Sequence, residues 1–361
     1  MVLSALIFTR PLRTRSKKRA QKGSMPDRPA RPSDQRSLTG LGQLVGALRN
    51  LGLIRIGRAE REHLAYFVAD DGQRIPVQVR GAGPPIVLVH GLACSHRHWS
   101  AVARRLARRF RVYAWDARGH GLCRTDAASR ITLERLARDL DNLISFFGLE
   151  RVALVGHSMG ALTVLQYLED FGAQHVAAIT LVDQSPRVVT DDEWRLGLFG
   201  GCSASMLAGL IAGARENLAE MVLREIEAIG NRWLQRRFAA DALLGRALRR
   251  WLQSMEVRPL LDLCDSLVLA DFRPLLDRLE LPLQVVLGGR SAHYSGVPLD
   301  AYYRQTVPHA WVEVYARSGH SPHYAEPARF ARDLARFIDN RDFDGQRAES
   351  TRKDLDADFA D

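Results

Sequence analysis

The five residues Gly156-His157-Ser158-Met159-Gly160 decide the fold of this chain, because they form the pattern G-x-S-x-G between a strand and a helix. The mostly apolar run from Arg151 to Val155 before them is typical of a buried strand, and the run from Ala161 to Leu168 after them is typical of a helix. A serine on such a tight turn has an exposed hydroxyl, and the two glycines let strand and helix approach closely. The free N–H groups at the helix N-terminus are suited to stabilising an oxyanion.

Strand and helix patterns alternate on both sides of this turn. A hairpin comes first, because two strand patterns flank the turn Asp70-Asp71-Gly72. Strands are expected at Leu64–Val68, Ile75–Val79, Pro85–Val89, Arg111–Trp115, Val176–Val182, Leu283–Leu287 and Trp311–Tyr315. Helices are expected after Trp99, over Leu133–Phe147 and over Pro327–Ile338. The alternation predicts an α/β fold, in which a mostly parallel, doubly wound sheet is covered by helices on both faces.

The alternation stops between about Pro186 and Leu279, where only helix patterns occur, such as the apolar spacings within residues 206–211 and 218–226. We interpret residues 186–279 as an inserted helical cap over the active site. The stretch falls between two sheet strands, at the edge where the catalytic loops emerge. The alternative is a helical segment that completes the core. The α/β core then comprises residues 38–185 and 280–338, and Leu41 to Ile56 has the pattern of a short amphipathic helix.

The net charge of +10 does not indicate a nucleic-acid partner, because much of it lies in one terminal segment without interleaved aromatic residues. Residues 1–37 carry ten basic and two acidic residues, whereas residues 339–361 carry four basic and eight acidic residues. We expect both segments to be disordered. The Arg-rich N-terminal segment fits an organelle transit peptide, and the competing interpretation is that Met25 is the true start.

Composition sets the broad class of the protein. Hydrophobic residues make up 46% and charged residues 25% of the 361 residues, which is ordinary for a globular protein. The longest apolar runs have about eight residues, too few for an integral membrane helix. The four cysteines lack C-x-x-C spacing, which favours a reducing compartment such as the cytoplasm. Composition does not fix the oligomeric state.

A serine nucleophile needs a base, which is usually a histidine oriented by a carboxylate. His320 is the favoured base for Ser158, because it follows the strand that ends near Tyr315, and α/β sites gather their groups at such strand ends. His323 is the nearby competitor, and the His157 side chain is expected to point away. The remaining candidates are predicted to be structural or surface residues: His96, His98 and His120.

An oxyanion also needs two N–H donors. The backbone N–H of Met159, directly after the serine, is one expected donor. The loop His90-Gly91-Leu92 after the strand that ends at Val89 is expected to supply the other, through the N–H of Leu92.

These motifs occur together in an order that resembles one superfamily. They are His90-Gly91-Leu92, the segment Asp116 to Gly121, the G-x-S-x-G turn and Gly319-His320. Over roughly residues 62–338 the chain resembles the α/β-hydrolase superfamily, in its branch of capped esterases, haloperoxidase-like proteins and C–C hydrolases. The resemblance implies that the Asp116 to Gly121 segment is a structural loop.

The chain departs from the family at the third catalytic residue. In the family the acid usually follows the strand here at Leu283–Leu287, in the pattern G-x-x-D, but this chain has Gly288-Gly289-Arg290-Ser291. Some members take the acid from the end of the preceding strand, where this chain has Asp183, and the order nucleophile, acid, base is then kept. Asp183 is therefore the preferred acid, with Asp300 or Asp265 as fallback. The competing interpretation makes Asp183 a capping or loop residue.

The resemblance implies a serine hydrolase that cleaves a carboxylic ester or thioester with an apolar portion through an acyl-enzyme intermediate. A haloperoxidase-like perhydrolase and a C–C bond hydrolase would use the same triad. A non-catalytic, ligand-binding member of the superfamily is the alternative from another class. Neither metal-ligand spacing nor a dinucleotide or phosphate-binding pattern occurs in the chain, so no metal and no cofactor are expected.

Overall fold

A computed structural model of the chain describes residues 64–125, 130–228, 246, 249–250, 253, 258–294 and 296–339. The segment 1–37, predicted to be disordered, and the expected helix at Leu41 to Ile56 lie outside these residues. Of the segment 339–361, also predicted to be disordered, only Asp339 is described, and it is the last residue of a helix. In the described part of the chain, no helix is both long enough and apolar enough to cross a membrane.

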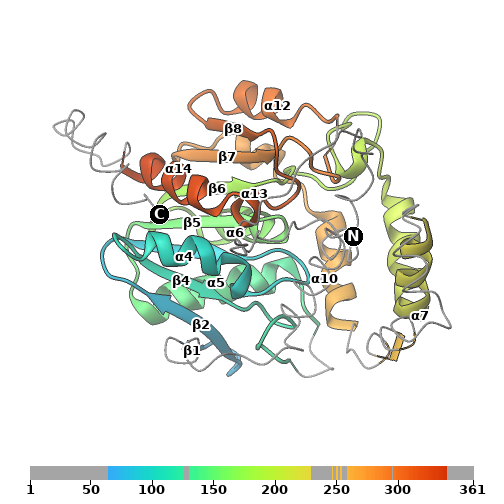
Figure 1. Ribbon diagram of the computed structural model, residues 1–361, viewed down its shortest axis with the longest axis horizontal. Coiled ribbons are helices and arrows are strands. Elements are labelled where there is room, and N and C mark those ends of the chain that lie inside the picture. The colour runs from blue at the N-terminus through green and yellow to red at the C-terminus, as the bar shows by residue number, and fades with distance from the viewer. Residues whose placement is uncertain are drawn as a thin grey trace, which may run out of the picture.

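The described residues form one eight-stranded sheet with the strand order β1-β2-β4-β3-β5-β6-β7-β8 (Figure 1). Strands β1 and β2 pair antiparallel with each other and β2 with β4, and all other neighbours are parallel. The strands are β1 (Leu64–Val68), β2 (Arg74–Arg80), β3 (Pro85–Val89), β4 (Arg111–Trp115), β5 (Val152–His157), β6 (Val176–Val182), β7 (Leu283–Gly288) and β8 (Trp311–Tyr315). The predicted α/β fold with a mostly parallel sheet is confirmed.

Helices cover both faces of this sheet because the central strands are apolar on both sides. Along β3, Ile86 and Leu88 face one apolar cluster, while Val87 and Val89 face the other. The first cluster includes α4 (Ser100–Leu106) and α14 (Pro327–Asp339), and the second includes α5 (Leu133–Phe147) and α6 (Met159–Phe171). The remaining short elements beside the core strands are η1 (His96–Trp99), α12 (Leu299–Thr306) and α13 (Pro322–Ala325).

Helix α5 shows how local sequence fixes these elements. Thr132 caps its N-terminus by accepting a hydrogen bond of 3.2 Å from the N–H of Arg135. The helix ends at Gly148, which takes a left-handed conformation with φ 56°. Helix and strand boundaries of this kind were predictable because the signals are local.

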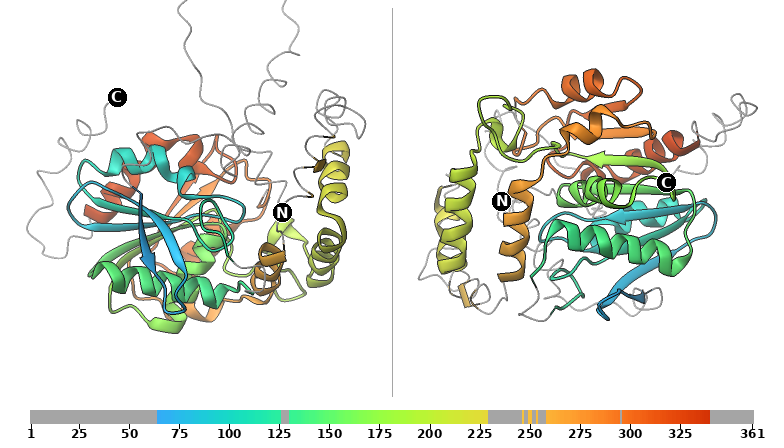
Figure 2. Two further views of the ribbon diagram at one scale, coloured as in Figure 1. Left: turned by 90° about the horizontal axis from the view of Figure 1, so that it is seen from below. Right: turned by 180° about the vertical axis from the view of Figure 1, so that it is seen from behind.

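The segment between β6 and β7 contains only helices among its described elements. These are η2 (Leu198–Gly200), α7 (Ala204–Ala228), α10 (Arg258–Leu269) and α11 (Arg273–Asp277). Figures 1 and 2 show α7 and α10 beside the sheet, with α10 closer to it than α7. Helix α7 is interrupted at Asn217, whose backbone is not helical and whose side chain accepts a hydrogen bond of 3.1 Å from the N–H of Glu220.

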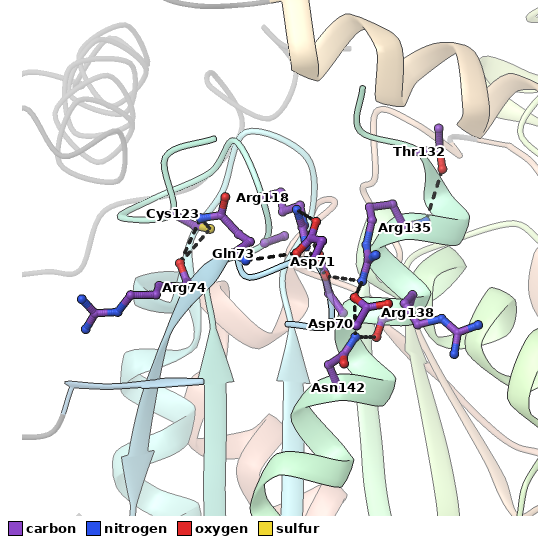
Figure 3. A network of polar contacts seen from close by, with 12 residues as sticks. Asp70, Asp71, Gln73, Arg74, Arg118, Cys123, Thr132, Arg135, Arg138 and Asn142 are labelled. Carbon is purple, nitrogen blue, oxygen red and sulfur yellow. Dashed lines mark hydrogen bonds and ion pairs between the residues drawn. The ribbon is translucent and has the colours of Figure 1, made fainter. Parts of the chain in front are cut away.

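A network of charged side chains ties the β1–β2 turn to α5 and to the loop after β4 (Figure 3). Arg118 lies on that loop and donates to both carboxylate oxygens of Asp139, at 2.6 and 2.8 Å, and also to Asp71 at 2.7 Å. Arg135 joins Asp70 at 2.7 Å to Asp139 at 2.8 Å. Because Arg118 and Asp139 are both buried, the loop after β4 is a structural element, as the resemblance implied.

We expect Asp139→Ala to lower the free energy of unfolding by about 3–5 kcal/mol, because it removes the buried partner of Arg118 and leaves that charge under-compensated. Urea unfolding followed by circular dichroism measures the change. The matched control is Asp141→Ala on the same helix, whose carboxylate lies 3.7 Å from the half-exposed Arg138. The control should lose less than about 1 kcal/mol, and equal losses in the two variants would show that the buried pair has no special role.

Candidate active site

Ser158 lies on the turn between β5 and α6 in a strained backbone conformation, with φ 53° and ψ −123°. A side chain at Gly156 would collide with the backbone of Gly160, and one at Gly160 would collide with the carbonyl oxygen of Val89. Both positions therefore require glycine, which is the physical reason for the G-x-S-x-G pattern. The turn leaves the Ser158 side chain partly exposed, although the residues beside it are buried.

Asp183 is placed at the end of β6, and three donors converge on its buried carboxylate. His320 Nδ1 lies 2.7 Å from Oδ2, the hydroxyl of Ser291 donates to Oδ2 at 2.6 Å, and the N–H of Gly288 donates to Oδ1 at 2.7 Å. The serine in the usual position of the acid is thus a direct hydrogen-bond donor to Asp183. The fallback acids take other places, since Asp265 forms an ion pair with Arg215 and Asp300 lies in the first turn of α12.

Burial sets the protonation states of this pair. It lowers the pKa of His320 to about 3, so the imidazole is neutral at neutral pH. Burial raises the pKa of Asp183, and the hydrogen bonds from Ser291 and from the N–H of Gly288 oppose that rise. A neutral His320 that donates from Nδ1 to the carboxylate keeps Nε2 free to accept a proton.

His320 and Ser158 line the same pocket. In the described part of the chain, the hydroxyl of Ser158 forms no hydrogen bond with His320. In unliganded hydrolases such contacts are often loose and tighten only when substrate is bound.

The other histidines near Ser158 differ in part from expectation. The side chain of His157 does not point away from the site: its Nε2 lies 2.8 Å from the carbonyl oxygen of His320, and the two rings lie 4.7 Å apart. His323 is fully buried and stacks on Trp99 at 4.0 Å, away from the pocket lining. The three other candidates are buried, structural residues: His96, His98 and His120.

The expected oxyanion donors lie at the pocket. Leu92 and Met159 both line it together with Ser158. The loop after β3 passes close to the serine, because a Cβ on Gly91 would stand only 3.2 Å from the Cβ of Ser158. Met159 is the first residue of α6, so its N–H has no partner within the helix. Among the described residues, no hydrogen bond uses the N–H of Leu92.

The pocket wall is mainly apolar, and part of it comes from the segment between β6 and β7. Val188, Leu198 of η2 and Leu267 of α10 belong to that segment. The apolar lining includes Leu92, Cys94, Met159, Leu162, Val188, Leu198 and Leu267. Among the described residues, no group of three or more His, Cys, Asp or Glu side chains is arranged to hold a metal ion.

Comparison with known proteins identifies the family of the chain. The model of a family described as the alpha/beta hydrolase family matches residues 86–333. The chain belongs to this family. This α/β hydrolase is 29% identical to a pimeloyl-(acyl-carrier protein) methyl ester esterase of Chromobacterium violaceum, over 73% of this chain and 98% of the relative. It is 24% identical to 3-oxoadipate enol-lactonase 1 of Acinetobacter baylyi, over 76% of this chain and 97% of the lactonase.

A solved structure shows the same fold. It is an esterase from Exiguobacterium antarcticum with a TM-score of 0.61 and 21% identity, matched over 76% of this chain and 99% of the esterase. Together the relatives support hydrolase activity for this α/β hydrolase.

Several residues of the pocket carry no sequence signal. His293 lines the pocket and stacks on His320 with ring centroids 3.8 Å apart, but it belongs to no motif. Leu198 and Leu267 lie in helical patterns that resemble ordinary core segments. Their position in the pocket follows only from the way remote segments fold onto the carboxyl edge of the sheet.

Proposed function

We propose that this α/β hydrolase is a serine hydrolase that cleaves a carboxylic ester or thioester with an apolar portion. The observation that carries the proposal is the hydrogen bond of 2.7 Å between His320 Nδ1 and the carboxylate of Asp183. His320 lines the same apolar pocket as Ser158, whose backbone is strained on its turn. Acyl transfer requires a nucleophile beside a neutral base, and a buried carboxylate that orients this base.

In the proposed mechanism, Ser158 attacks the carbonyl carbon while Nε2 of His320 removes the hydroxyl proton. Asp183 orients His320 and stabilises its charged form. The N–H groups of Leu92 and Met159 stabilise the negative charge on the carbonyl oxygen. His320 protonates the leaving group, and then it activates the water that releases the acyl group from Ser158.

The substrate class rests on the pocket and on the relatives. The names of the relatives describe a methyl ester esterase and an enol-lactonase, both of which act on esters. The apolar lining favours an apolar portion next to the scissile bond. We further propose that residues 186–279 form a cap, and the position of Val188, Leu198 and Leu267 of this segment in the pocket lining with Ser158 supports this proposal.

Labelling with a fluorophosphonate probe tests the nucleophile. We expect the folded wild-type protein to be labelled at Ser158, and we expect Ser158→Ala to show neither labelling nor hydrolysis of nitrophenyl esters. Mass spectrometry of the labelled peptide identifies the modified residue. Wild-type protein that remains unlabelled while it is folded would favour a non-catalytic, ligand-binding role.

Assays of the wild-type protein with different substrates distinguish between the reactions that share this triad. A panel of nitrophenyl esters of rising acyl length should show turnover that depends on chain length, because the pocket wall is apolar. Labelling of Ser158 without turnover of any ester or thioester would direct attention to C–C bond cleavage of a diketone or to perhydrolysis.

A further inference from the structure

His293 lies on the loop after β7, where it joins the catalytic loops to the segment between β6 and β7. It is buried and lines the pocket together with Ser158 and His320. Its ring is nearly parallel to that of His320, with an interplanar angle of 26° and 3.8 Å between the centroids. This is the closest ring contact that His320 makes among the described residues, since the His157 ring lies at 4.7 Å and at a tilt of 52°.

Phe199 of η2 makes a second ring contact with His293. The N–H of Phe199 donates to the carbonyl oxygen of His293 at 2.7 Å, and the two rings stack at 5.7 Å with an angle of 23°. Phe199 has φ 57°, a left-handed conformation that is unfavourable for a bulky residue. Such strain persists only where surrounding contacts impose it, and the contacts with His293 are among those that hold this turn.

Hydrogen bonding through Nδ1 does not explain the position of the His293 side chain. Its Nδ1 is buried and has no hydrogen-bond partner among the described residues. A buried polar atom without a partner costs free energy, so the flat shape of the ring is the property that the site uses. The loop that carries His293 also carries Ser291, which holds Asp183. One loop thus touches both the acid and the base.

We propose that His293 is a positioning residue, which holds the imidazole of His320 by stacking and, through Phe199, connects that imidazole to the segment between β6 and β7. The proposal rests on the proposed function for its catalytic consequence, but the ring contact itself is independent of turnover. Among the described residues, the groups around His320 include Ser158 and His157 of the nucleophile turn, Asp183 after β6, His293 after β7 and the buried His323 of α13.

The ring contact is tested by following the titration of His320 by NMR in the folded protein. Burial lowers the pKa of His320, so removal of the covering ring should admit water and raise the pKa towards its ordinary value of about 6.5. We expect this rise in His293→Ala and not in His293→Phe, which keeps a flat ring in the same place. His309→Ala, at an exposed histidine, serves as control and should leave the titration of His320 unchanged.

Kinetics of nitrophenyl ester hydrolysis give the catalytic consequence. In His293→Ala we expect kcat to fall about tenfold to a hundredfold, as for a base displaced by about 1 Å, with KM changed by less than about threefold, and the acid limb of the pH profile should move to higher pH. His293→Phe should retain kcat within about threefold. If His293→Ala does not fold, Phe199→Ala takes its place, since Phe199 is 45% exposed, and a smaller shift in the same direction is expected.

The outcomes separate this inference from the proposed function. An unchanged His320 titration in a folded His293→Ala or Phe199→Ala variant overturns the inference, and so does an equal shift in His293→Phe and His293→Ala. A wild-type protein without any hydrolysis overturns the proposed function, while the titration still decides on the ring contact.

Discussion

Replacement of Asp183 by asparagine should lower the kcat of ester hydrolysis about 10⁴-fold while the protein remains folded. Asparagine has the shape of aspartate and tolerates the left-handed backbone that Asp183 adopts at φ 50°. It carries no charge, so it no longer stabilises the protonated form of His320. The amide group can also turn its N–H₂ towards Nδ1, which would favour the wrong tautomer of the imidazole. Kinetics with a nitrophenyl ester, together with a melting curve, measure the two properties separately.

Ser291 offers a matched control and a rescue. Ser291→Ala removes one of three donors to the carboxylate and should lower kcat by only about tenfold, which corresponds to about 1.4 kcal/mol. Ser291 Oγ and His320 Nδ1 contact the same oxygen of Asp183. The double variant Asp183→Ser with Ser291→Asp exchanges the two groups and should recover part of the lost activity. If Asp183→Asn kept more than about a tenth of the wild-type kcat, the acid of the triad would lie elsewhere in the chain.

The fold of this protein follows from local signals, and its sequence therefore predicts the fold well. The expected strands at Pro85–Val89, Arg111–Trp115 and Val176–Val182 have the bounds found in the structure. Each is a short apolar run that ends at turn residues, and no contact with a remote segment is needed to recognise it. The turn around Ser158 is equally local, because its glycines are required by the adjacent strand and helix.

The candidate site is only partly predictable, because its fine geometry depends on contacts between remote residues. Asp183 and Ser291 are 108 positions apart, and only the pairing of β6 with β7 brings their side chains together. The sequence shows that Ser291 stands where the family usually has the aspartate. It does not show that the hydroxyl of Ser291 donates a hydrogen bond to Asp183. The prediction that the His157 side chain points away from the site is wrong for the same reason, since its partner is the carbonyl oxygen of the remote His320. The sequence does not predict a role for His293, because ring stacking between remote residues produces no spacing pattern in the sequence.

We expect the protein to unfold in mild acid, near pH 5, because many histidines are buried in their neutral form. Burial lowers the pKa of seven of them: His90, His98, His120, His157, His293, His320 and His323. In the unfolded chain each histidine takes up a proton near pH 6.5. Below this pH the unfolded state therefore binds more protons than the folded state, and the free energy of unfolding falls as the pH falls.

The free energy lost through these histidines is comparable to the whole stability of a typical domain. Each buried histidine costs about 1.4 kcal/mol per pH unit below about 6.5, so seven of them cost more than about 10 kcal/mol at pH 5. Burial also raises the pKa of five carboxyl groups, which are Asp139, Asp141, Asp170, Asp183 and Glu313. Their raised pKa values stabilise the folded state in acid but offset only part of the loss from the seven histidines. Because a typical domain is stable by about 5–15 kcal/mol, the balance should be lost near pH 5. Circular dichroism during a pH titration measures the midpoint.

His323 provides the sharpest single test of this argument. Its ring is fully buried between Trp99 at 4.0 Å, His157 at 4.6 Å and Phe330 at 5.9 Å, and neither ring nitrogen has a hydrogen-bond partner among the described residues. His323→Phe keeps an aromatic ring in this place but removes the group that takes up a proton on unfolding. Relative to wild type, the variant should gain about 2 kcal/mol more at pH 5 than at pH 7.5, as measured by urea unfolding at both values.

The exposed His309 gives the matched substitution, and His309→Phe should change stability equally at the two pH values. A His323→Phe variant whose stability follows the wild-type pH dependence would mean that His323 takes up its proton at the same pH in the folded protein as in the unfolded chain. The acid sensitivity would then have to come from the carboxylates instead. The two origins differ in the range where stability is lost, because carboxylates with ordinary values protonate near pH 4 and histidines near pH 6.5. A midpoint close to pH 5 that falls in His323→Phe therefore assigns the loss to the buried histidines.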